Sequence, residues 1–221
     1  MMKPEQLEAG PAPAKPLTNA SPLLVLISAP SGGGKTTLCQ QLLATRPSMS
    51  RVITCTTRPP REGEQDGVDY YFLDAASFLK RVQAGNFLEH ATVYGHSYGT
   101  LKSEVLGKLR QGRDVLLNVD VQGAATIRQK AQEDAELKSA LVTVFLTPPS
   151  IATLEERLRK RDTDSEAVIQ KRLSVARQEI AHWKHFDYLL LSDTISEDLR
   201  RMLAILEAEK MRTFRVGAPG C

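Results

Sequence analysis

The segment from Leu23 to Thr37 constrains the fold of this chain more than any other. An apolar run, Leu23–Ile27, leads through Ser28 into Ala-Pro-Ser-Gly-Gly-Gly-Lys-Thr-Thr at residues 29–37. An uninterrupted apolar run is typical of a strand buried on both faces of a parallel sheet. The Lys-Thr-Thr after the glycines predicts the first turn of a helix. We therefore expect the folded part to begin with a buried strand, a tight turn and a helix.

The same turn has the composition of a phosphate-binding loop. Three consecutive glycines let backbone N–H groups turn inward around phosphate oxygens. Lys35 would reach the β- and γ-phosphates of a nucleoside triphosphate, the Thr36 hydroxyl would ligate Mg²⁺, and the helix N-terminus would add its dipole. One departure from the usual pattern is Ala29, which stands where the first glycine is expected. The predicted phosphate-binding set is Ala29, Pro30, Ser31, Gly32, Gly33, Gly34, Lys35, Thr36 and Thr37.

Composition limits the partners of the chain. At 221 residues with 42% hydrophobic content, it can form a domain with a substantial core. A net charge of +3 gives no case for a nucleic-acid polymer as partner. The three cysteines lack Cys-x-x-Cys spacing, which argues against a disulfide framework or a zinc site. This cysteine pattern fits a reducing cytoplasm, where we expect the protein to be. No apolar stretch approaches the ~18 residues of a membrane span, so no membrane partner is expected.

Strand and helix signals alternate along the chain. Strands are predicted at Leu23–Ile27, Arg51–Thr56, Val68–Leu73, Phe87–Val93, Val115–Val121, Leu141–Thr147 and Tyr188–Leu191. The central strands have helices between them, which indicates right-handed crossovers in a doubly wound, parallel α/β core. The short strands between residues 51 and 98 do not follow this rhythm and predict a small mixed α/β lobe inserted into the core.

Capping residues mark several predicted helices. Asp74 is expected to cap a helix that runs to about Ala84, and Ser150 to cap another. The run from Thr163 to Glu166 has the form of a capping box that opens a further helix. A helical face is also predicted from Thr100 to Arg110. The proline-rich residues 1–21 and the residues 216–221 are expected to be loose ends.

A second set of motifs narrows the function. Thr-Thr-Arg-x-x-Arg-x-Gly-Glu at residues 56–64 holds Arg58 and Arg61 close together, and two guanidinium groups suit a phosphate monoester. Tyr-Gly-Thr at residues 98–100 and Asp-x-Gln-Gly at residues 120–123 follow. In this order the motifs, together with the phosphate loop, resemble the guanylate kinase family from about Leu23 to the end of the last helix.

The resemblance implies a fold, a reaction and substrates. The reaction is transfer of the γ-phosphoryl group of MgATP to GMP or dGMP, which gives ADP and GDP from GMP. The implied P-loop core comprises residues 22–53, 105–149 and 175–215, with a GMP-binding lobe at 54–104 and a helical lid at 150–174. The oligomeric state is not predicted.

The resemblance also implies roles for single residues. The GMP-binding positions are Thr54, Arg58, Arg61, Tyr70, Glu89, Tyr98, Thr100 and Asp120, with the arginines and tyrosines on the phosphate and the other four on guanine. The catalytic set is Lys35, Arg58, Arg157, Arg161 and Arg172, the last three being lid contacts to the ATP phosphates. The chemistry agrees, because carboxylates match the N1 and N2 donors of guanine. Adenine has no proton on N1, and an unpaired buried polar group costs about 1–3 kcal/mol.

Two positions depart from the family pattern. Asn118 stands where many relatives carry an acid, so Mg²⁺ is expected at Thr36 with Asn118 or Asp120 acting through water. Ser192 stands where relatives often have Asn, near the expected adenine site. Two alternatives remain open: a catalytically inactive guanylate-kinase-like interaction module, and a P-loop kinase for another nucleoside monophosphate. No general base is evident, and a phosphate acceptor that is already ionised does not need one.

Overall fold

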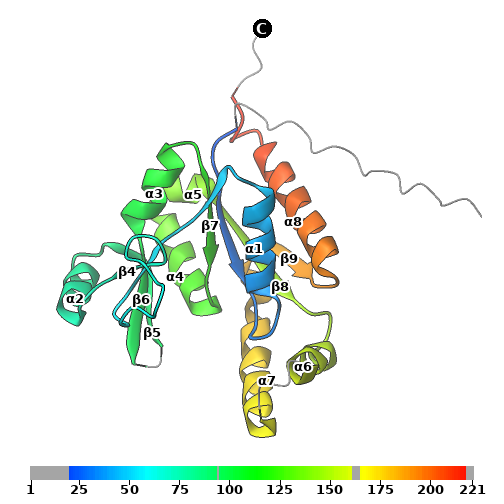
Figure 1. The fold of residues 1–221 in the computed structure, drawn as a ribbon. Coiled ribbons are helices and arrows are strands. Elements are labelled where there is room, and N and C mark those ends of the chain that lie inside the picture. The colour runs from blue at the N-terminus through cyan, green and yellow to red at the C-terminus, as the bar shows by residue number, and fades with distance from the viewer. Residues whose placement is uncertain (1–19, 94, 161–164, 218–221) are drawn as a thin grey trace, which may run out of the picture.

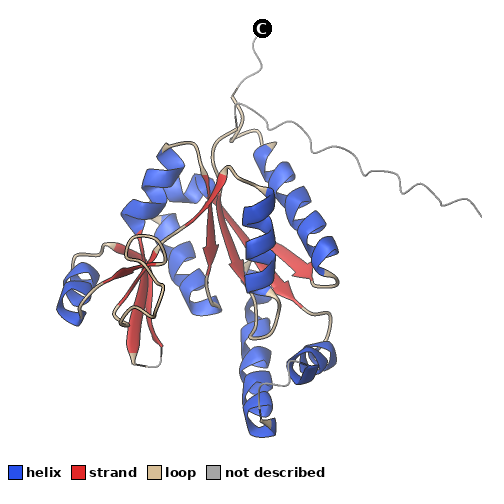
Figure 2. Ribbon diagram, in the orientation of Figure 1, coloured by secondary structure: helices blue, strands red, loops and turns tan. Residues whose placement is uncertain are grey.

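Two β-sheets of different kinds organise the chain (Figure 1, Figure 2). The computed structural model describes residues 20–93, 95–160 and 165–217. Within these residues, the elements in chain order are β1 (Leu24–Ser28), α1 (Lys35–Thr45), β2 (Met49–Arg51), β3 (Thr54–Thr56), β4 (Tyr70–Phe72), α2 (Ala75–Gln83), β5 (Phe87–Val93), β6 (His96–Leu101), α3 (Lys102–Arg110), β7 (Asp114–Asn118), α4 (Val121–Gln132), α5 (Ala135–Ala140), β8 (Leu141–Thr147), α6 (Ile151–Lys160), α7 (Glu166–Ile180), the 3₁₀ helix η1 (Ala181–His185), β9 (Tyr188–Leu191) and α8 (Ile195–Lys210). The predicted strands Phe87–Val93, Leu141–Thr147 and Tyr188–Leu191 are confirmed to the residue.

The larger sheet is parallel and lies between two layers of helices. Its strand order is β2-β7-β1-β8-β9, and every neighbouring pair in it is parallel. Val25 and Ile27 face a core that includes residues of α1 and α8, whereas Leu24 and Leu26 face a core formed with α3, α4 and α5. This double burial explains the unbroken apolar run in β1 and confirms the predicted doubly wound core.

The smaller sheet forms a lobe beside the core. Its order is β4-β3-β6-β5, with β3 parallel to β4 and antiparallel to β6. Phe78 of α2 stacks on Phe87 of β5 with ring centroids 4.6 Å apart, and the buried Cys55 completes this core. The predicted cap is confirmed, since the Asp74 side chain accepts the Ser77 N–H at 2.7 Å.

Helices α6 and α7 form a third packed unit, drawn below the larger sheet in Figure 1. Its core includes Leu154 and Leu158 from α6 and Ile169 and Leu173 from α7. The predicted Ser150 cap is confirmed by the Thr153 N–H, which donates to the Ser150 hydroxyl at 3.0 Å.

Several predicted boundaries are wrong, each for a local reason. The expected strand Arg51–Thr56 is two strands, because the chain passes from one sheet to the other at residues 52–53. The expected strand Val115–Val121 ends at Asn118, because Asp120 caps α4 by accepting the Gly123 N–H at 2.7 Å. Thr100 belongs to strand β6, which the sequence did not predict, and the helix begins at Lys102.

The predicted start of helix α7 and the predicted loose ends of the chain also differ from the structure. Helix α7 begins at Glu166 with Ser165 as its N-cap, and Glu166 pairs with Arg159, so Glu166 does not take the N3 position of a capping box. Residues 161–164, which include Thr163, lie outside the described residues. Ala20 forms an isolated antiparallel bridge with Val216, so both predicted loose ends reach into paired backbone. Residues 1–19 and 218–221 lie outside the described residues.

Candidate active site

The turn between β1 and α1 has the backbone that a phosphate loop requires. Gly32 and Gly34 have φ of +87° and +93°, and Gly34 is the N-cap of α1. These values lie in the left-handed region, where side chains are strained. A Cβ on Gly32 would also lie 2.8 Å from Leu158 Cδ2, so the loop packs directly against α6. The glycines therefore serve both the shape of the loop and its contact with the α6–α7 unit.

Lys35 points from the start of α1 towards the end of β7. Its Nζ donates to the carbonyl oxygen of Val119 at 2.9 Å. Burial lowers the pKa of Lys35, and the nearby carboxylate of Asp120 opposes this shift. The Lys35 ammonium group, with one carbonyl partner and a nearby carboxylate, can therefore bind a phosphate group that enters the loop.

A cavity of about 330 Å³ lies over the loop. All nine predicted phosphate-binding residues, 29–37, line it, together with Asp120 and Glu179. Glu179, near the end of α7, accepts the Ser31 N–H at 3.2 Å, and burial raises the pKa of its carboxyl group. The sequence did not predict Glu179 as a site residue, because it belongs to no phosphate-loop motif and only the fold brings α7 to the loop.

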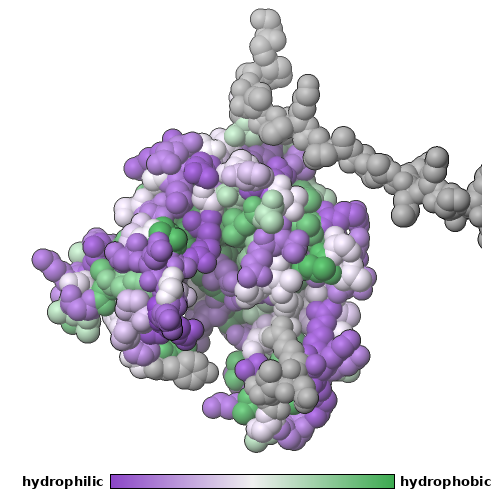
Figure 3. Space-filling view, in the orientation of Figure 1, coloured by the Kyte–Doolittle hydropathy of each residue, from purple (hydrophilic) through white to green (hydrophobic). Residues whose placement is uncertain are grey.

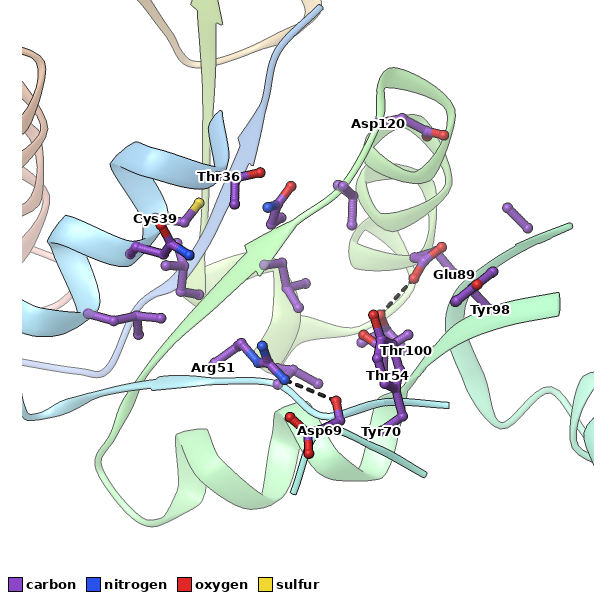
Figure 4. Close-up of a pocket in the computed structure, with 18 of the residues that line it drawn as sticks. Thr36, Cys39, Arg51, Thr54, Asp69, Tyr70, Glu89, Tyr98, Thr100 and Asp120 are labelled. Carbon is purple, nitrogen blue, oxygen red and sulfur yellow. Dashed lines mark hydrogen bonds between the residues drawn. The ribbon is translucent and has the colours of Figure 1, made fainter. Parts of the chain in front are cut away.

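A second cavity, of about 430 Å³, lies between the smaller sheet and the core (Figure 4). Six of the eight predicted GMP-binding residues line it: Thr54, Tyr70, Glu89, Tyr98, Thr100 and Asp120. The predicted metal-binding residues Thr36 and Asn118 line it as well. Thr36 and Asp120 line both cavities. The two cavities therefore adjoin at a hydroxyl and a carboxylate.

Glu89 and Thr100 form the most buried polar pair of the second cavity. The Thr100 hydroxyl donates to Glu89 Oε1 at 2.6 Å, and both residues are buried. Burial raises the pKa of Glu89; the hydrogen bond from Thr100 opposes the rise and the charge of Asp120 adds to it. Glu89 and the nearby Asp120 form a pair of carboxylates that can accept hydrogen bonds from two neighbouring N–H groups of a base.

Arg58 and Arg61 lie beside this cavity, and among the described residues they do not belong to its lining. The Arg58 guanidinium lies 5.4 Å from the ring centroid of Tyr70, and the Tyr70 ring meets Tyr98 edge-on at 6.3 Å. Arg58 Nη2 donates to both oxygens of Glu64, at 2.7 and 2.8 Å. Arg58, Tyr70 and Tyr98 are thus brought together, whereas the Arg61 residue is exposed nearby.

The predicted lid arginines have different surroundings. Arg157 of α6 donates to the Ser192 hydroxyl at 2.9 Å and to the Asp193 carbonyl oxygen at 3.0 Å, in the turn between β9 and α8. Arg172 is half-buried on α7, and neither arginine lines the cavities in the part of the chain that the structure describes. Arg161 lies outside the described residues. Figure 3 shows the molecule hollowed between the small lobe and the α6–α7 unit.

Neither a reactive cysteine nor a cluster of metal-binding side chains is found among the described residues. Burial raises the pKa of Cys39, which lines the second cavity, to about 11, so its thiol stays protonated at neutral pH and is a poor nucleophile. The described residues hold no cluster of three His, Cys, Asp or Glu side chains that would bind a metal by themselves. None of the described helices has the length and apolar character needed to cross a membrane.

Similar proteins were found by sequence and by structure. A family model described as guanylate kinase matches residues 21–209. The chain is 46% identical over 189 residues to a guanylate kinase of Coxiella burnetii, which covers 86% of this chain and 88% of the relative. It is 44% identical over 194 residues to one of Carboxydothermus hydrogenoformans, with coverage of 88% and 92%. The crystal structure of guanylate kinase from Anaplasma phagocytophilum is similar with a TM-score of 0.67 and 31% identity, and covers 89% of this chain and 90% of that one.

Proposed function

This chain belongs to the guanylate kinase family, and we propose that its two adjoining cavities hold the two substrates of an ATP:GMP phosphotransferase. The enzyme transfers the γ-phosphoryl group of ATP to GMP. One observation carries the assignment of the cavities. The cavity of the small lobe, lined by six predicted GMP-binding residues, shares Thr36 and Asp120 with the cavity over the phosphate loop. The acceptor phosphate and the donor phosphates therefore meet at the boundary of the two.

GMP binds in the larger cavity with its base towards Glu89. The Glu89 and Asp120 carboxylates accept hydrogen bonds from the guanine N1–H and N2 amino group, and the Thr54 hydroxyl donates to O6. Thr100 holds Glu89 in place through its 2.6 Å hydrogen bond. The acceptor dGMP carries the same base and phosphate and uses the same groups.

The phosphate of GMP binds on the side of Arg58. Tyr70 and Tyr98 line the cavity next to the Arg58 guanidinium, which supports a phosphate position within reach of all three. Arg61 joins them when the acceptor is bound. A guanidinium offers two parallel N–H donors to a phosphate, and hydrogen bonds between charged groups are stronger than neutral ones.

ATP binds with its phosphates on the loop of residues 29–37. Backbone N–H groups of the loop and the N-terminus of α1 surround the phosphate oxygens. Lys35 exchanges its bond to the Val119 carbonyl oxygen for the β- and γ-phosphates. Arg157, Arg161 and Arg172 approach the phosphates when residues 150–174 close as a lid, which excludes water from the site.

Mg²⁺ fits the oxygen groups at the boundary of the cavities. The Thr36 hydroxyl, the Asn118 amide oxygen and the Asp120 carboxylate are hard oxygen donors, and all three line the larger cavity. Thr36 would bind the ion directly, and Asn118 or Asp120 through water. The ion would neutralise negative charge on the donor phosphates.

The chain contributes to catalysis by alignment and by neutralising charge. A GMP phosphate oxygen is ionised at neutral pH, so attack on the γ-phosphorus requires no general base. Lys35 and the arginines stabilise the charge that shifts onto the leaving ADP. The presence of Lys35 and Thr36 in the phosphate loop and of Arg58 argues against an inactive interaction module, and Glu89 and Asp120 argue against a kinase for another nucleotide.

ADP release measured with GMP, AMP, UMP and dTMP in parallel tests this function. We expect rapid turnover with GMP and slow turnover with the other three acceptors. The Lys35→Ala variant should fold, and its kcat should be about 10²–10³-fold lower, as expected for the loss of one positioned transition-state contact. Comparable rates with several acceptors would contradict the proposed specificity. A folded Lys35→Ala variant with wild-type turnover would remove Lys35 from the mechanism.

A further inference from the structure

Glu64 makes a set of contacts that the proposed mechanism does not use. Its two carboxylate oxygens accept from Arg58 Nη2 at 2.7 and 2.8 Å. The side chain of Arg58 is 11% exposed and that of Glu64 is 20% exposed, so the pair is largely shielded from water. Each group favours the charged form of the other, since the hydrogen bond raises the pKa of Arg58 and lowers that of Glu64. The pair is therefore ionised at neutral pH.

The backbone, and not only the guanidinium, fixes the position of the Glu64 carboxylate. The Arg61 N–H donates to Glu64 Oε2 at 2.7 Å, and the Glu64 N–H donates to the Arg61 carbonyl oxygen at 3.0 Å. These two bonds close the turn of residues 61–64 on itself. The carboxylate would consequently stay in place if the guanidinium moved, so it acts as a fixed support for Arg58.

The remaining contacts of Arg58 define how its guanidinium faces the acceptor cavity. Nη1 donates to the Pro59 carbonyl oxygen at 2.7 Å, and the guanidinium lies over the Tyr70 ring. A guanidinium has five N–H donors, so the bonds to Glu64 and Pro59 and the hydrogen bond with Tyr98 leave at least one donor for a phosphate. Tyr70 and Tyr98 line the cavity beside it. The fork of Arg58 is thus held at the cavity edge before any nucleotide binds.

We propose that Glu64 is a positioning residue for the acceptor phosphate: it holds Arg58 and the backbone of Arg61 in the geometry that receives the phosphate of GMP. This role rests on the proposed function, because it presumes that a phosphate monoester binds beside Arg58. Holding a long side chain in its bound conformation lowers the entropy lost on binding. Glu64 therefore strengthens the binding of GMP although it carries the same sign of charge as the phosphate.

Electrostatic repulsion between Glu64 and the phosphate predicts the opposite change in GMP affinity, and this gives the proposal a clear test. A carboxylate beside a phosphate also repels it and competes for the same guanidinium, so charge alone predicts tighter GMP binding when Glu64 is neutralised. Positioning predicts weaker binding. The sign of the change in GMP affinity decides between them.

The experiment compares Glu64→Ala and Glu64→Gln with the matched control Glu62→Gln. Glu62 is an exposed residue of the same turn, so its substitution removes one negative charge without touching the Arg58 contact. We expect Glu64→Ala to raise the KM and the calorimetric Kd for GMP about fivefold, the upper end of the range for ion pairs near the protein surface. Glu64→Gln, which keeps one carbonyl acceptor, should have a smaller effect, and the KM for ATP should stay within twofold in both variants, about the scatter of such comparisons.

A double-mutant cycle separates positioning from a general effect on the fold. If Glu64 acts mainly through Arg58, then Glu64→Ala should raise the GMP Kd less in an Arg58→Lys background than in the wild type, because lysine cannot make the same fork and only the support of the Arg61 backbone is left to lose. An unchanged or lower GMP Kd in Glu64→Ala, or an equal loss in both backgrounds, would overturn the inference. Failure of the proposed function would look different, since the wild type itself would then not bind or phosphorylate GMP.

Discussion

At the scale of single residues, Glu89 combines a benefit to substrate recognition with a cost to the fold. Its carboxylate is buried and accepts the Thr100 hydroxyl, and burial raises its pKa above the usual 4.5. A folded state with a raised carboxyl pKa binds more protons than the unfolded state between the two pKa values. The stability that Glu89 contributes is therefore greatest below pH 4.5 and decreases as pH rises through the raised pKa. At neutral pH the charge destabilises the protein without substrate.

The substitution Glu89→Gln should therefore stabilise the free enzyme at pH 7. Glutamine keeps an oxygen that accepts the Thr100 hydroxyl and removes the buried charge. We expect the Tm of the variant to exceed that of the wild type by about 2–4 °C, the shift that corresponds to about 1 kcal/mol in a chain of this size.

Thermal melts at pH 7 and pH 5 check this expectation. The difference between the two proteins should shrink at the lower pH, because the raised pKa of Glu89 means that a larger share of its carboxyl groups is protonated there in the wild type. The variant Glu62→Gln, at an exposed position, should melt like the wild type at both values. A lower Tm for Glu89→Gln at pH 7 would contradict the assigned cost of the buried carboxylate.

At the scale of secondary-structure elements, the strands of the larger sheet were easier to predict from the sequence than the point where the chain passes from one sheet to the other. The strands of the core carry unbroken apolar runs because both of their faces are buried, and such runs are easily recognised. The split of residues 51–56 between two sheets was missed, because β-branched residues indicate extended backbone without indicating the partner strand.

The residues of the site also differ in how well the sequence predicts them, depending on whether they belong to a local motif. Residues inside local motifs, such as Lys35, Glu89 and Asp120, could be proposed from the sequence, and they line the cavities. Glu179 was missed because the chain returns to the phosphate loop only at the end of α7, far along the sequence. Local spacing carries no information about such a contact, and tertiary packing alone creates it.

Glu179 yields a prediction for the link between α7 and the phosphate loop. Its carboxylate accepts the Ser31 N–H, and it lines the same cavity as Lys35. We expect Glu179→Ala to raise the KM for ATP about tenfold, since a hydrogen bond that includes a charged group contributes on the order of 1.5 kcal/mol. Glu179→Gln keeps an acceptor and should change it less.

The KM for GMP serves as the internal control, because the smaller lobe makes no use of Ser31. Both KM values are measured by ADP release with the other substrate saturating. A GMP effect as large as the ATP effect, or a larger loss in Glu179→Gln than in Glu179→Ala, would contradict a support of the loop by hydrogen bonding.

At the scale of the whole molecule, three packed units surround the two cavities. The α6–α7 unit has its own apolar core and touches the phosphate loop through Leu158 and Gly32. The small lobe has a separate core around Phe78 and Phe87. Units with their own cores can move as bodies on the larger sheet, and closure over both substrates would bring the lid arginines to the phosphates.

Hydrogen exchange tests this closure. We expect a bisubstrate analogue, in which the two nucleosides are joined through phosphates, to slow amide exchange in peptides of residues 150–174. GMP alone or ATP alone should protect these peptides much less, and peptides of the central strand β1 provide the unchanged control. Equal protection in the free enzyme and in the complex would show that these residues do not act as a lid.

The ratio of kcat/KM for GMP to kcat/KM for AMP, in the wild type and in Glu89→Gln, tests the assignment of guanine recognition most directly. A site built to hydrogen-bond specific groups rejects an analogue that lacks them by about 10⁴-fold, so the wild-type ratio should be of that order. Glu89→Gln should lower the ratio at least tenfold, mainly through the loss of GMP activity, because the amide replaces an acceptor of the N1–H and N2 donors. Comparable use of AMP and GMP by the wild type, or an unchanged ratio in the variant, would contradict the assignment of Glu89 to guanine.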